Sequence, residues 1–510
     1  MDDYQRIADA VAADIAAGRL RPGDRLAPQR AFARTHRIAN STAVRVYREL
    51  ARRGLTVGEV GRGTYVRAAQ HAPGPALAEP SAAAPSAGVQ VNLELNYPVV
   101  PEQSALLAAG LRSLLRPDAL DAAMRPIAPA GTRAARAEAA ALLTGRGFRP
   151  DPDQVLFAGN GRQALAGALA ALVPPGGRLG VEAFTYPLVK AVASRIGVTL
   201  VPLAMDEYGV RPDAVRAAHR GGPLHALYLQ PTLHNPLGVT VPAWRRGEIA
   251  DVLYELGLWA IEDAVWAFLD AGEDGGGGEG AGGGAATTPV GNTGPHADLA
   301  TAPPPLAALA PDRTILVDSL SKRLAPGLTV GLLLPPAALT ERVATALRSG
   351  GWTATGFALD AVTRWLADGT VARIVAAKRR DAAARQELVR AHLGDFRVRA
   401  DPRAYFAWWE LPAPWRAETF LAAAARRGIT VTPGAAFAVG LEGPRGVRDA
   451  KGVRGAWDED MVRGAAGGPG GPAPSAVRVA LASPAPDVLA YALRTLVGIA
   501  RGTPEDTVPD

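Results

Sequence analysis

The sequence contains no cysteine among its 510 residues. This absence excludes disulfide bonds, thiolate metal sites and cysteine nucleophiles. It also lacks any apolar run of about 18 residues, the length that a membrane span needs. The N-terminal residues MDDYQRIADA have neither the basic start nor the apolar core of a secretory signal. These absences together predict a protein of the reducing cytoplasm with no membrane partner.

Lysine is scarce, because arginine fills nearly every basic position. The chain has only four lysines, which are Lys190, Lys322, Lys378 and Lys451. Arginine stays protonated and cannot form a Schiff base, whereas lysine can. Each lysine is therefore a candidate for chemistry that a guanidinium cannot perform.

The net charge of +6 is confined to the N-terminal end. Residues 1–67 hold 13 arginines against 7 acidic residues, and the rest of the chain is neutral overall. A basic excess in one small unit is typical of a surface that faces phosphate. An arginine-rich composition throughout is the alternative, and charge alone does not decide between the two.

The N-terminal unit has the pattern of three helices followed by two short strands. Apolar residues at helical spacing predict a helix over 4–17, and Pro28 suits the start of a second over 28–36. Asn40 or Ser41 can cap a third helix that runs to about Arg53. Strands are expected at 55–57 and 64–66, joined through residues 58–63. Three helices and a β-hairpin make a winged helix.

The third helix is predicted to have one apolar and one basic face. Its apolar face consists of Val44, Tyr47, Leu50 and Ala51. Its other face consists of Ser41, Arg45, Arg48 and Arg52. Such a helix can enter the major groove of DNA, although a charge stripe alone is more often a solvated face. The predicted DNA contacts are Arg30, Ser41, Thr42, Arg45 and, in the wing, Gly63.

This unit resembles the GntR family of winged helix-turn-helix regulators. The matching pattern covers nearly all of residues 4–67 and includes Pro22-Gly23-Asp24-Arg25-Leu26 and Gly61-Arg62-Gly63-Thr64-Tyr65-Val66. The resemblance implies binding to a double-stranded DNA operator. The family usually has an arginine just before the recognition helix, where this chain has Asn40, so the base preference departs from the family pattern.

The rest of the chain is predicted to be a linker and an α/β domain. Residues 68–91 are rich in Ala, Pro and Ser and resemble a linker. Beyond about residue 130, apolar runs alternate with helical stretches, which indicates a largely parallel sheet. Segments 271–300 and 441–475 are low-complexity insertions with no assigned function. The predicted strands are 155–158, 179–182, 199–202, 226–230, 259–262, 314–318 and 330–334.

The clearest chemical signal is the stretch Asp318-Ser319-Leu320-Ser321-Lys322. A predicted strand ends there in small hydroxyl residues and a rare lysine, and ligands of parallel sheets bind at that edge. The lysine can form an aldimine with pyridoxal 5'-phosphate (PLP), and the hydroxyls can hold its phosphate. Ser319 also stands three residues before the lysine, as in β-lactamase-like S-x-x-K motifs. The stretch alone therefore leaves both chemistries open.

Four further features follow other predicted strands. Asp263 can pair with a pyridinium nitrogen, and the amide of Asn235 can donate to a phenolic oxygen. Gly161 and Arg162 lie between a strand and a helix, where backbone N–H groups bind phosphate. Tyr186 can stack on a ring, although core packing is as common for a tyrosine. Each feature alone has an ordinary structural explanation, but their combination favours PLP.

Together these features resemble class I aminotransferases of fold type I, over about residues 92–500 apart from the insertions. The resemblance implies a body of large and small subdomains that follows the linker and runs through 92–510. It implies that Lys322 binds PLP, Asp263 pairs with its nitrogen and Asn235 with its phenolate, while Tyr186 stacks on the ring. Arg478 would clamp the α-carboxylate of an amino acid with its planar fork. The implied phosphate site consists of Gly161, Arg162, Ser319 and Ser321.

Two positions depart from the aminotransferase pattern. Thr329 and Val330 stand where a phosphate-binding arginine is usual. A charged hydrogen bond contributes roughly 1.5–3 kcal/mol, so its loss weakens PLP binding about ten- to a hundred-fold unless Arg323 or Arg162 compensates. Trp266 stands where a tyrosine is usual and cannot supply a phenol. We therefore expect at most weak transaminase activity.

A GntR-like head joined to an aminotransferase-like body is the architecture of the MocR subfamily of GntR regulators. The resemblance implies a cytoplasmic regulator that senses PLP or an amino compound and forms a head-to-tail homodimer. Two alternatives stay open. One is a working aminotransferase with a DNA-binding appendage, and the other is a regulator whose body has lost PLP and serves as a dimerisation scaffold.

Overall fold

The structure is a computed structural model that describes residues 3–16, 19–20, 24–52, 55–59, 63–66, 90–270, 302–439 and 475–504. Most of the predicted linker and both predicted insertions, apart from Ser475, lie outside these residues. Among the residues described, no helix is long and apolar enough to cross a membrane.

The head contains the predicted three helices and hairpin, together with one strand that was not predicted. The helices are α1 (Asp3–Ala16), α2 (Gln29–Thr35) and α3 (Asn40–Arg52). The strands are β1 (Arg25–Leu26), β2 (Thr56–Glu59) and β3 (Gly63–Val66), in the order β1-β3-β2. The pairing of β1 with β3 enlarges the hairpin to a three-stranded sheet.

The predicted apolar face of α3 was partly wrong. Tyr47 and Leu50 are buried as expected, but their partners in the core are Ala43 and Val46. Val44 is only half-buried and Ala51 is exposed. The helix is thus turned by about one residue from the predicted orientation, because its inner face is fixed by the core that it shares with α1 and α2.

The large subdomain is built on a seven-stranded sheet that contains all seven predicted strands. Its order is β5-β13-β12-β11-β10-β6-β7, in which β13 pairs antiparallel with β5 and β12 and all other neighbouring strands are parallel. The strands are β5 (Leu156–Ala158), β6 (Arg178–Glu182), β7 (Thr199–Leu203), β10 (Ala226–Leu229), β11 (Trp259–Asp263), β12 (Thr314–Ser319) and β13 (Gly331–Leu334).

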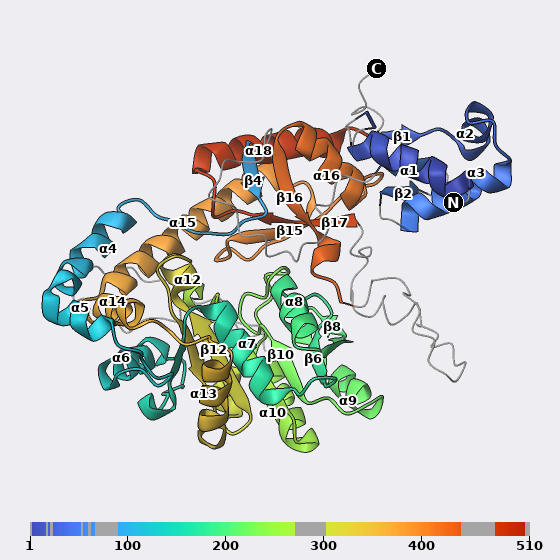
Figure 1. Ribbon diagram of the computed structural model, residues 1–510. Helices are drawn as coiled ribbons and strands as arrows, with labels where there is room; N and C mark the ends of the chain where they lie inside the picture. Colours follow the sequence, from blue (N-terminus) through green and yellow to red (C-terminus); the bar gives the residue numbers. More distant parts are fainter. Residues whose placement is uncertain are drawn as a thin grey trace, which may run out of the picture.

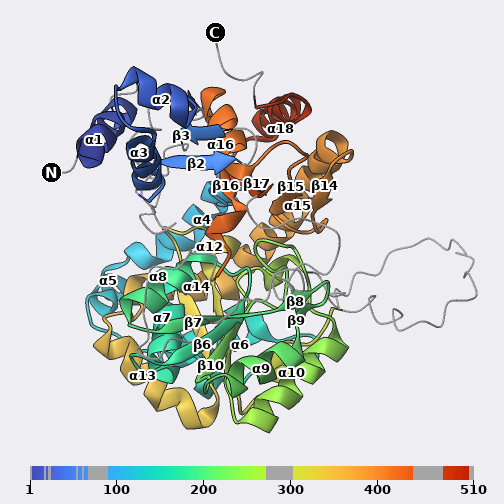
Figure 2. The same cartoon turned by 90° about the vertical axis from the view of Figure 1, so that its right-hand side faces the viewer.

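Helices cover both faces of this sheet (Figure 2). One face carries α7 (Gly161–Leu172), α8 (Pro187–Arg195) and α13 (Thr340–Ser349). The other carries α9 (Pro212–Arg220), α10 (Ala243–Leu256) and α11 (Leu306–Leu309). In β10, Tyr228 points to the first core and its neighbours Leu227 and Leu229 to the second. Burial on both faces explains why such strands are continuous apolar runs in the sequence.

The small subdomain has a five-stranded sheet in the order β14-β15-β17-β16-β4. β4, from the start of the body, lies parallel to β16 from near its end (Figure 1). Val91, assigned to the linker from the sequence, therefore belongs to the body. The elements are β4 (Val91–Leu93), β14 (Arg397–Arg399), β15 (Phe406–Glu410), α16 (Ala417–Arg426), β16 (Ile429–Pro433), β17 (Ala476–Ala480) and α18 (Pro486–Arg501).

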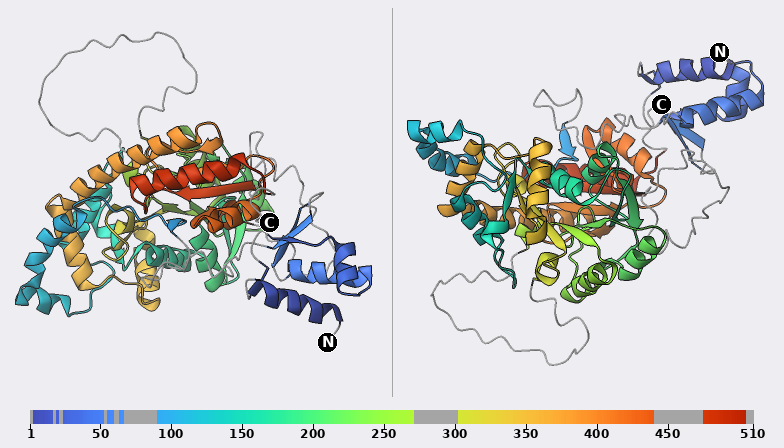
Figure 3. Two further views of the ribbon diagram at one scale, coloured as in Figure 1. Left: turned by 90° about the horizontal axis from the view of Figure 1, so that it is seen from above. Right: turned by 60° about the horizontal axis from the view of Figure 1, so that its bottom comes forward.

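The long helix α15 (Thr370–Leu393) belongs to both subdomains. One part of it packs in the core of the large subdomain, and its last turns pack in the core of the small one. Figure 3 shows it beside α18. The other elements of the body are α4 (Gln103–Leu111), α5 (Pro117–Ala123), α6 (Arg133–Leu143), β8 (Met205–Asp206), β9 (Gly209–Val210), α12 (Leu320–Arg323) and α14 (Gly356–Ala367).

Candidate functional site

The predicted site residues of the body meet at one edge of the seven-stranded sheet. Asp263 is the last residue of β11 and Ser319 the last residue of the adjacent parallel strand β12. Asn235 follows β10, and Tyr186 follows β6 as the residue before α8. Gly161 begins α7 directly after β5. This edge is where ligands of open α/β sheets bind.

Lys322 lies on the short helix α12, next to the end of β12. Its Nζ donates to the carbonyl oxygen of Asn96 at 2.6 Å and lies 4.5 Å from the ring centre of Tyr97 and 5.3 Å from that of Trp266. Burial lowers the pKa of Lys322 to about 7, and the positive charge of Arg478 acts in the same direction. Near neutral pH a large share of the amine is therefore the free base, the form that attacks a carbonyl.

Asp263 accepts hydrogen bonds from two side chains, one on β10 and one on the residue that follows β10. Its Oδ2 accepts hydrogen bonds from the Tyr228 hydroxyl at 2.6 Å and from Gln230 Nε2 at 3.0 Å. Burial raises the pKa of Asp263, while the hydrogen bond from Tyr228 opposes this shift. The Oε1 of Gln230 accepts from the backbone N–H of Asn235 at 3.3 Å. One amide side chain thus fixes Asp263 relative to Asn235, and neither Tyr228 nor Gln230 was predicted.

Arg478 reaches the site from β17 of the small subdomain, where it is 7 % exposed. Its Nη2 donates to the carbonyl oxygen of Glu94 at 2.7 Å and to Thr432 Oγ1 at 2.9 Å. Its Nε is buried and has no hydrogen-bond partner among the described residues. The same holds for Oδ1 of Asn235. Both atoms are placed to bind a polar ligand, since a buried polar atom left unpaired costs stability.

Residues 94–97, which we call the bridging segment, contact both cations. The carbonyl oxygen of Glu94 accepts from Arg478 and that of Asn96 from Lys322. Asn96 Oδ1 accepts from the N–H of Ala482 at 3.2 Å, which ties the segment to the loop after β17. The sequence analysis missed this segment, because backbone carbonyls leave no signal in side-chain patterns.

The end of the site that was predicted to bind phosphate is lined by small residues. A Cβ added at Gly161 would lie 2.8 Å from Ser319 Oγ, so only glycine fits there without a shift. Ser319 Oγ accepts from the N–H of Ser321 at 3.4 Å. Ser321 Oγ lies 3.1 Å from Thr329 Oγ1. Thr329 stands where the aminotransferase pattern has an arginine. It therefore places a second hydroxyl beside that of Ser321 and contributes no positive charge.

The two candidates to replace that arginine differ in their contacts. Arg323 is buried, forms an ion pair with Asp318 and lies 5.2 Å from the ring centre of Phe268, so it is committed elsewhere. Arg162 is the second residue of α7, next to Gly161, and its charge opposes the effect of burial on the pKa of Tyr186. Burial nevertheless raises the pKa of Tyr186 to about 12, so its phenol stays protonated.

A second lysine supports the turn that carries Lys322. Lys378 of α15 is fully buried, and its Nζ donates to the carbonyl oxygens of Lys322 at 2.9 Å and Leu324 at 2.6 Å. These carbonyls lie at the end of α12, where a helix cannot satisfy them itself. Burial lowers the pKa of Lys378 to about 7. The residue was noted in the sequence as rare but had no assigned role.

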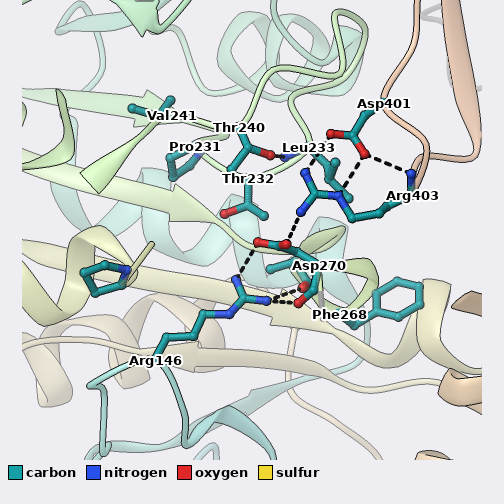
Figure 4. A network of polar contacts seen from close by, with 12 residues as sticks. Arg146, Pro231, Thr232, Leu233, Thr240, Val241, Phe268, Asp270, Asp401 and Arg403 are labelled. Carbon is teal, nitrogen blue, oxygen red and sulfur yellow. Dashed lines mark hydrogen bonds and ion pairs between the residues drawn. The ribbon is translucent and has the colours of Figure 1, made fainter. Parts of the chain in front are cut away.

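The segment after Asp263 is fastened to both subdomains (Figure 4). Asp270 forms ion pairs with Arg146 at 3.1 Å and with Arg403, which also pairs with Asp401 at 2.7 Å. Between its ends, Trp266 packs among aromatic residues of the core, with its ring 5.7 Å from that of Phe406. The Trp266 ring is therefore buried and packed in place beside Lys322, at the position where the aminotransferase pattern has a tyrosine.

The predicted DNA contacts of the head lie mainly on its surface. Arg30, Ser41 and Arg45 are exposed and Thr42 is half-buried. The guanidinium of Arg45 lies 4.5 Å from the ring centre of Tyr4 in α1. Gly63 has a φ of +126°, and a Cβ there would lie 2.7 Å from the Nε of Arg25. The backbone therefore requires glycine at this position, whether or not it contacts phosphate.

Comparison with known proteins assigns both parts of the chain. The family of class I and II aminotransferases matches residues 90–448, and the gntR family of bacterial regulatory proteins matches residues 3–66. The chain belongs to the class I and II aminotransferase family. Its head is a GntR helix-turn-helix domain. This arrangement agrees with the MocR architecture predicted from the sequence.

Relatives that match most of the chain are named as regulators. The HTH-type transcriptional regulator YdeF of Bacillus subtilis is 27% identical, over 87% of this chain and 89% of that one. The HTH-type pyridoxine biosynthesis transcriptional regulator PdxR of Corynebacterium glutamicum is 27% identical, over 75% and 76%. This protein is accordingly a transcriptional regulator with an aminotransferase-like domain.

Solved structures match the body. An archaeal alanine:glyoxylate aminotransferase has a TM-score of 0.63 at 19% identity, over 81% of this chain and 90% of that one. LysN, an α-aminoadipate aminotransferase of Thermus thermophilus, has a TM-score of 0.61 at 21% identity, over 81% and 92%. At these identities the likeness shows the fold, which is fold type I.

Proposed function

We propose that this protein is a PLP-dependent transcriptional regulator. Its body binds PLP through Lys322 and senses PLP itself or an amino compound, and its heads bind an operator as a homodimer. The observation that carries the proposal is the meeting of Lys322, Asp263 and Asn235 at one edge of the seven-stranded sheet, with Arg478 reaching the same site from the small subdomain. A scaffold without a ligand has no need to keep the unpaired donor Arg478 Nε buried there.

The residues at this edge suit the parts of PLP. Asp263 would face the ring nitrogen, Asn235 the phenolic oxygen and Tyr186 the ring face. The phosphate would lie against the N-terminus of α7, where Gly161 leaves room and Arg162 adds charge. When bound, PLP supplies an aldehyde for amines and an electron sink. LysN, of the same fold, was solved with a phosphopyridoxyl-leucine compound.

An amino-compound effector would be recognised by the side chains of Lys322 and Arg478. Lys322 holds its amine partly as the free base and can take or release a proton there, while Arg478 presents its fork to a carboxylate. Arg478→Ala should abolish the response to amino acids while leaving PLP bound. An unaltered response of this variant to every amino-acid effector would contradict the carboxylate role.

The surface of the body supports a homodimer. Large apolar side chains are exposed on the neighbouring elements α5 and α14 and on the residues that flank α5. They are Leu115 (65 % exposed), Leu120 (39 %), Met124 (76 %) and Phe357 (39 %). Exposed apolar clusters of this kind mark interaction surfaces. The substitution Met124→Glu together with Leu115→Glu should give monomers in sedimentation analysis.

The first experiment is a visible spectrum of the full-length protein after addition of PLP and removal of the excess, before and after borohydride. Lys322→Ala is measured alongside. A band that reduction abolishes and the variant lacks supports the cofactor site. The absence of a band at saturating PLP would favour the scaffold alternative.

A second assay separates a regulator from an enzyme. Sustained turnover of an amino donor with a keto acceptor would favour the working aminotransferase. A single slow half-reaction, together with a change in operator binding when the effector is added, favours the regulator. Because a ligand shifts an equilibrium only by binding one state better, operator affinity must differ between the loaded and unloaded protein.

A further inference from the structure

The bridging segment, residues 94–97, accepts hydrogen bonds from both Lys322 and Arg478 through its backbone carbonyl oxygens. Among the described residues, no other segment does this. It follows β4, the first strand of the body, and β4 follows the stretch that joins the body to the head. The two cations on which the proposed function rests are thus both bonded to the part of the body nearest in sequence to the DNA-binding head.

A ligand and the bridging segment compete for the same donor atoms. The Lys322 ammonium donates to the Asn96 carbonyl at 2.6 Å, and an amine that has reacted with an aldehyde has fewer protons to donate. Arg478 Nη2 already donates to the Glu94 carbonyl at 2.7 Å, while its Nε has no partner among the described residues. A carboxylate that binds the fork formed by Nε and Nη2 therefore competes with Glu94.

The other bonds of the segment limit where it can move. Ser483 Oγ donates to the Leu95 carbonyl at 2.8 Å and accepts from the N–H of Tyr97 at 3.2 Å. These bonds anchor the segment to the small subdomain, whereas Lys322 ties it to the large one. Loss of the Lys322 bond leaves the small-subdomain anchors in place. The segment is then held from the side of the small subdomain only.

We propose that the bridging segment couples occupancy of the Lys322 and Arg478 site to the DNA-binding head. Ligand binding takes the donors away from Glu94 and Asn96, which changes the position of the segment and of the chain that enters it. This proposal deepens the proposed function and rests on it for the identity of the ligand. The contacts themselves do not depend on that identity.

The test uses the absence of cysteine from the chain. Gln90→Cys places a single thiol on an exposed residue just before β4, where it can carry an environment-sensitive fluorophore. Arg397→Cys is the matched control, because it lies on β14, the opposite edge strand of the same sheet. Each labelled full-length protein is measured with and without PLP and alanine. Hydrogen exchange of residues 94–97 is followed in parallel on the unlabelled protein.

The expected result is a ligand-dependent change in emission at residue 90 and little change at residue 397. Exchange at residues 94–97 should quicken about tenfold or more, since it tracks local opening. Lys322→Met without ligand should move the residue 90 signal toward the liganded value, because it removes the bond to Asn96. Ser483→Ala should keep the visible PLP band but weaken the coupling between ligand and operator binding.

Two outcomes separate this inference from the proposed function. If PLP alters operator binding while residue 90 and the exchange of residues 94–97 stay unchanged, the coupling role is overturned and the cofactor assignment stands. If no PLP band forms, the proposed function fails. The comparison of Lys322→Met with the parent at residue 90 still tests the segment, and an unchanged signal there would overturn the coupling.

Discussion

Replacement of Thr329 by arginine should convert a weak phosphate site into a strong one. Thr329 Oγ1 lies 3.1 Å from Ser321 Oγ, at the end of the site where we propose that phosphate binds, and it contributes a hydroxyl where the aminotransferase pattern has an arginine. A charge-assisted hydrogen bond to phosphate contributes roughly 1.5–3 kcal/mol. Thr329→Arg should therefore lower the dissociation constant for PLP about ten- to a hundred-fold.

The assay is a titration of the full-length protein with PLP, followed by the visible band and by tryptophan fluorescence. Thr329→Ala is the first control and should change the affinity by no more than about tenfold, because it removes only a neutral hydrogen bond. Pyridoxal, which lacks the phosphate, is the second control. If Thr329→Arg tightens pyridoxal and PLP equally, or tightens neither while its melting temperature is unchanged, the phosphate argument is wrong.

Three further predictions follow from the geometry. Because burial lowers the pKa of Lys322 to about 7, the fraction of the amine that is the free base increases as the pH rises through that value. Loading with PLP in a stopped-flow instrument should be about tenfold faster at pH 8 than at pH 6, and a slower rate at pH 8 would contradict this. Lys378→Met removes the donor to the carbonyls of Lys322 and Leu324 and should weaken PLP binding about tenfold. Arg245→Met, which removes a buried cation of α10 that bonds to the Val210 carbonyl, should lower only the melting temperature. Arg45→Ala should weaken operator binding in gel-shift titrations and reduce the salt slope by about one, whereas an unchanged slope would remove Arg45 from the phosphate contacts.

The large subdomain was readily predicted because its strands are buried on both faces. A run such as Ala226–Leu229 is apolar at every position, and its sequence alone indicates a central strand. The strands of the small subdomain gave weaker signals. Arg397–Arg399 carries two arginines on an edge strand, and β4 has only three residues, so neither has a pattern that identifies it. Pairing across the chain, not local preference, makes these segments strands.

Most side chains of the candidate site could be predicted because they follow parallel strands of the seven-stranded sheet, whereas Arg478 lies within β17 of the other sheet. Parallel order brings the ends of β6, β10, β11 and β12 to one edge, so residues from distant parts of the chain had to meet. The residues behind them could not be predicted in this way. Tyr228 lies in an apolar run, and this sequence pattern predicts only that it packs in the core. The structure shows that its hydroxyl lies 2.6 Å from Asp263 Oδ2.

The missed contacts share a physical cause that bears on function. Glu94 and Asn96 act through carbonyl oxygens, and Lys378 acts on the carbonyls of Lys322 and Leu324, so the bonds that position the reactive amine are largely backbone bonds. Backbone acceptors are present at every residue and cannot be selected by side-chain type. What the sequence can select is the rare donor, and in this chain both buried lysines of the site are donors. The scarcity of lysine therefore identifies the two amines around which the local backbone is arranged.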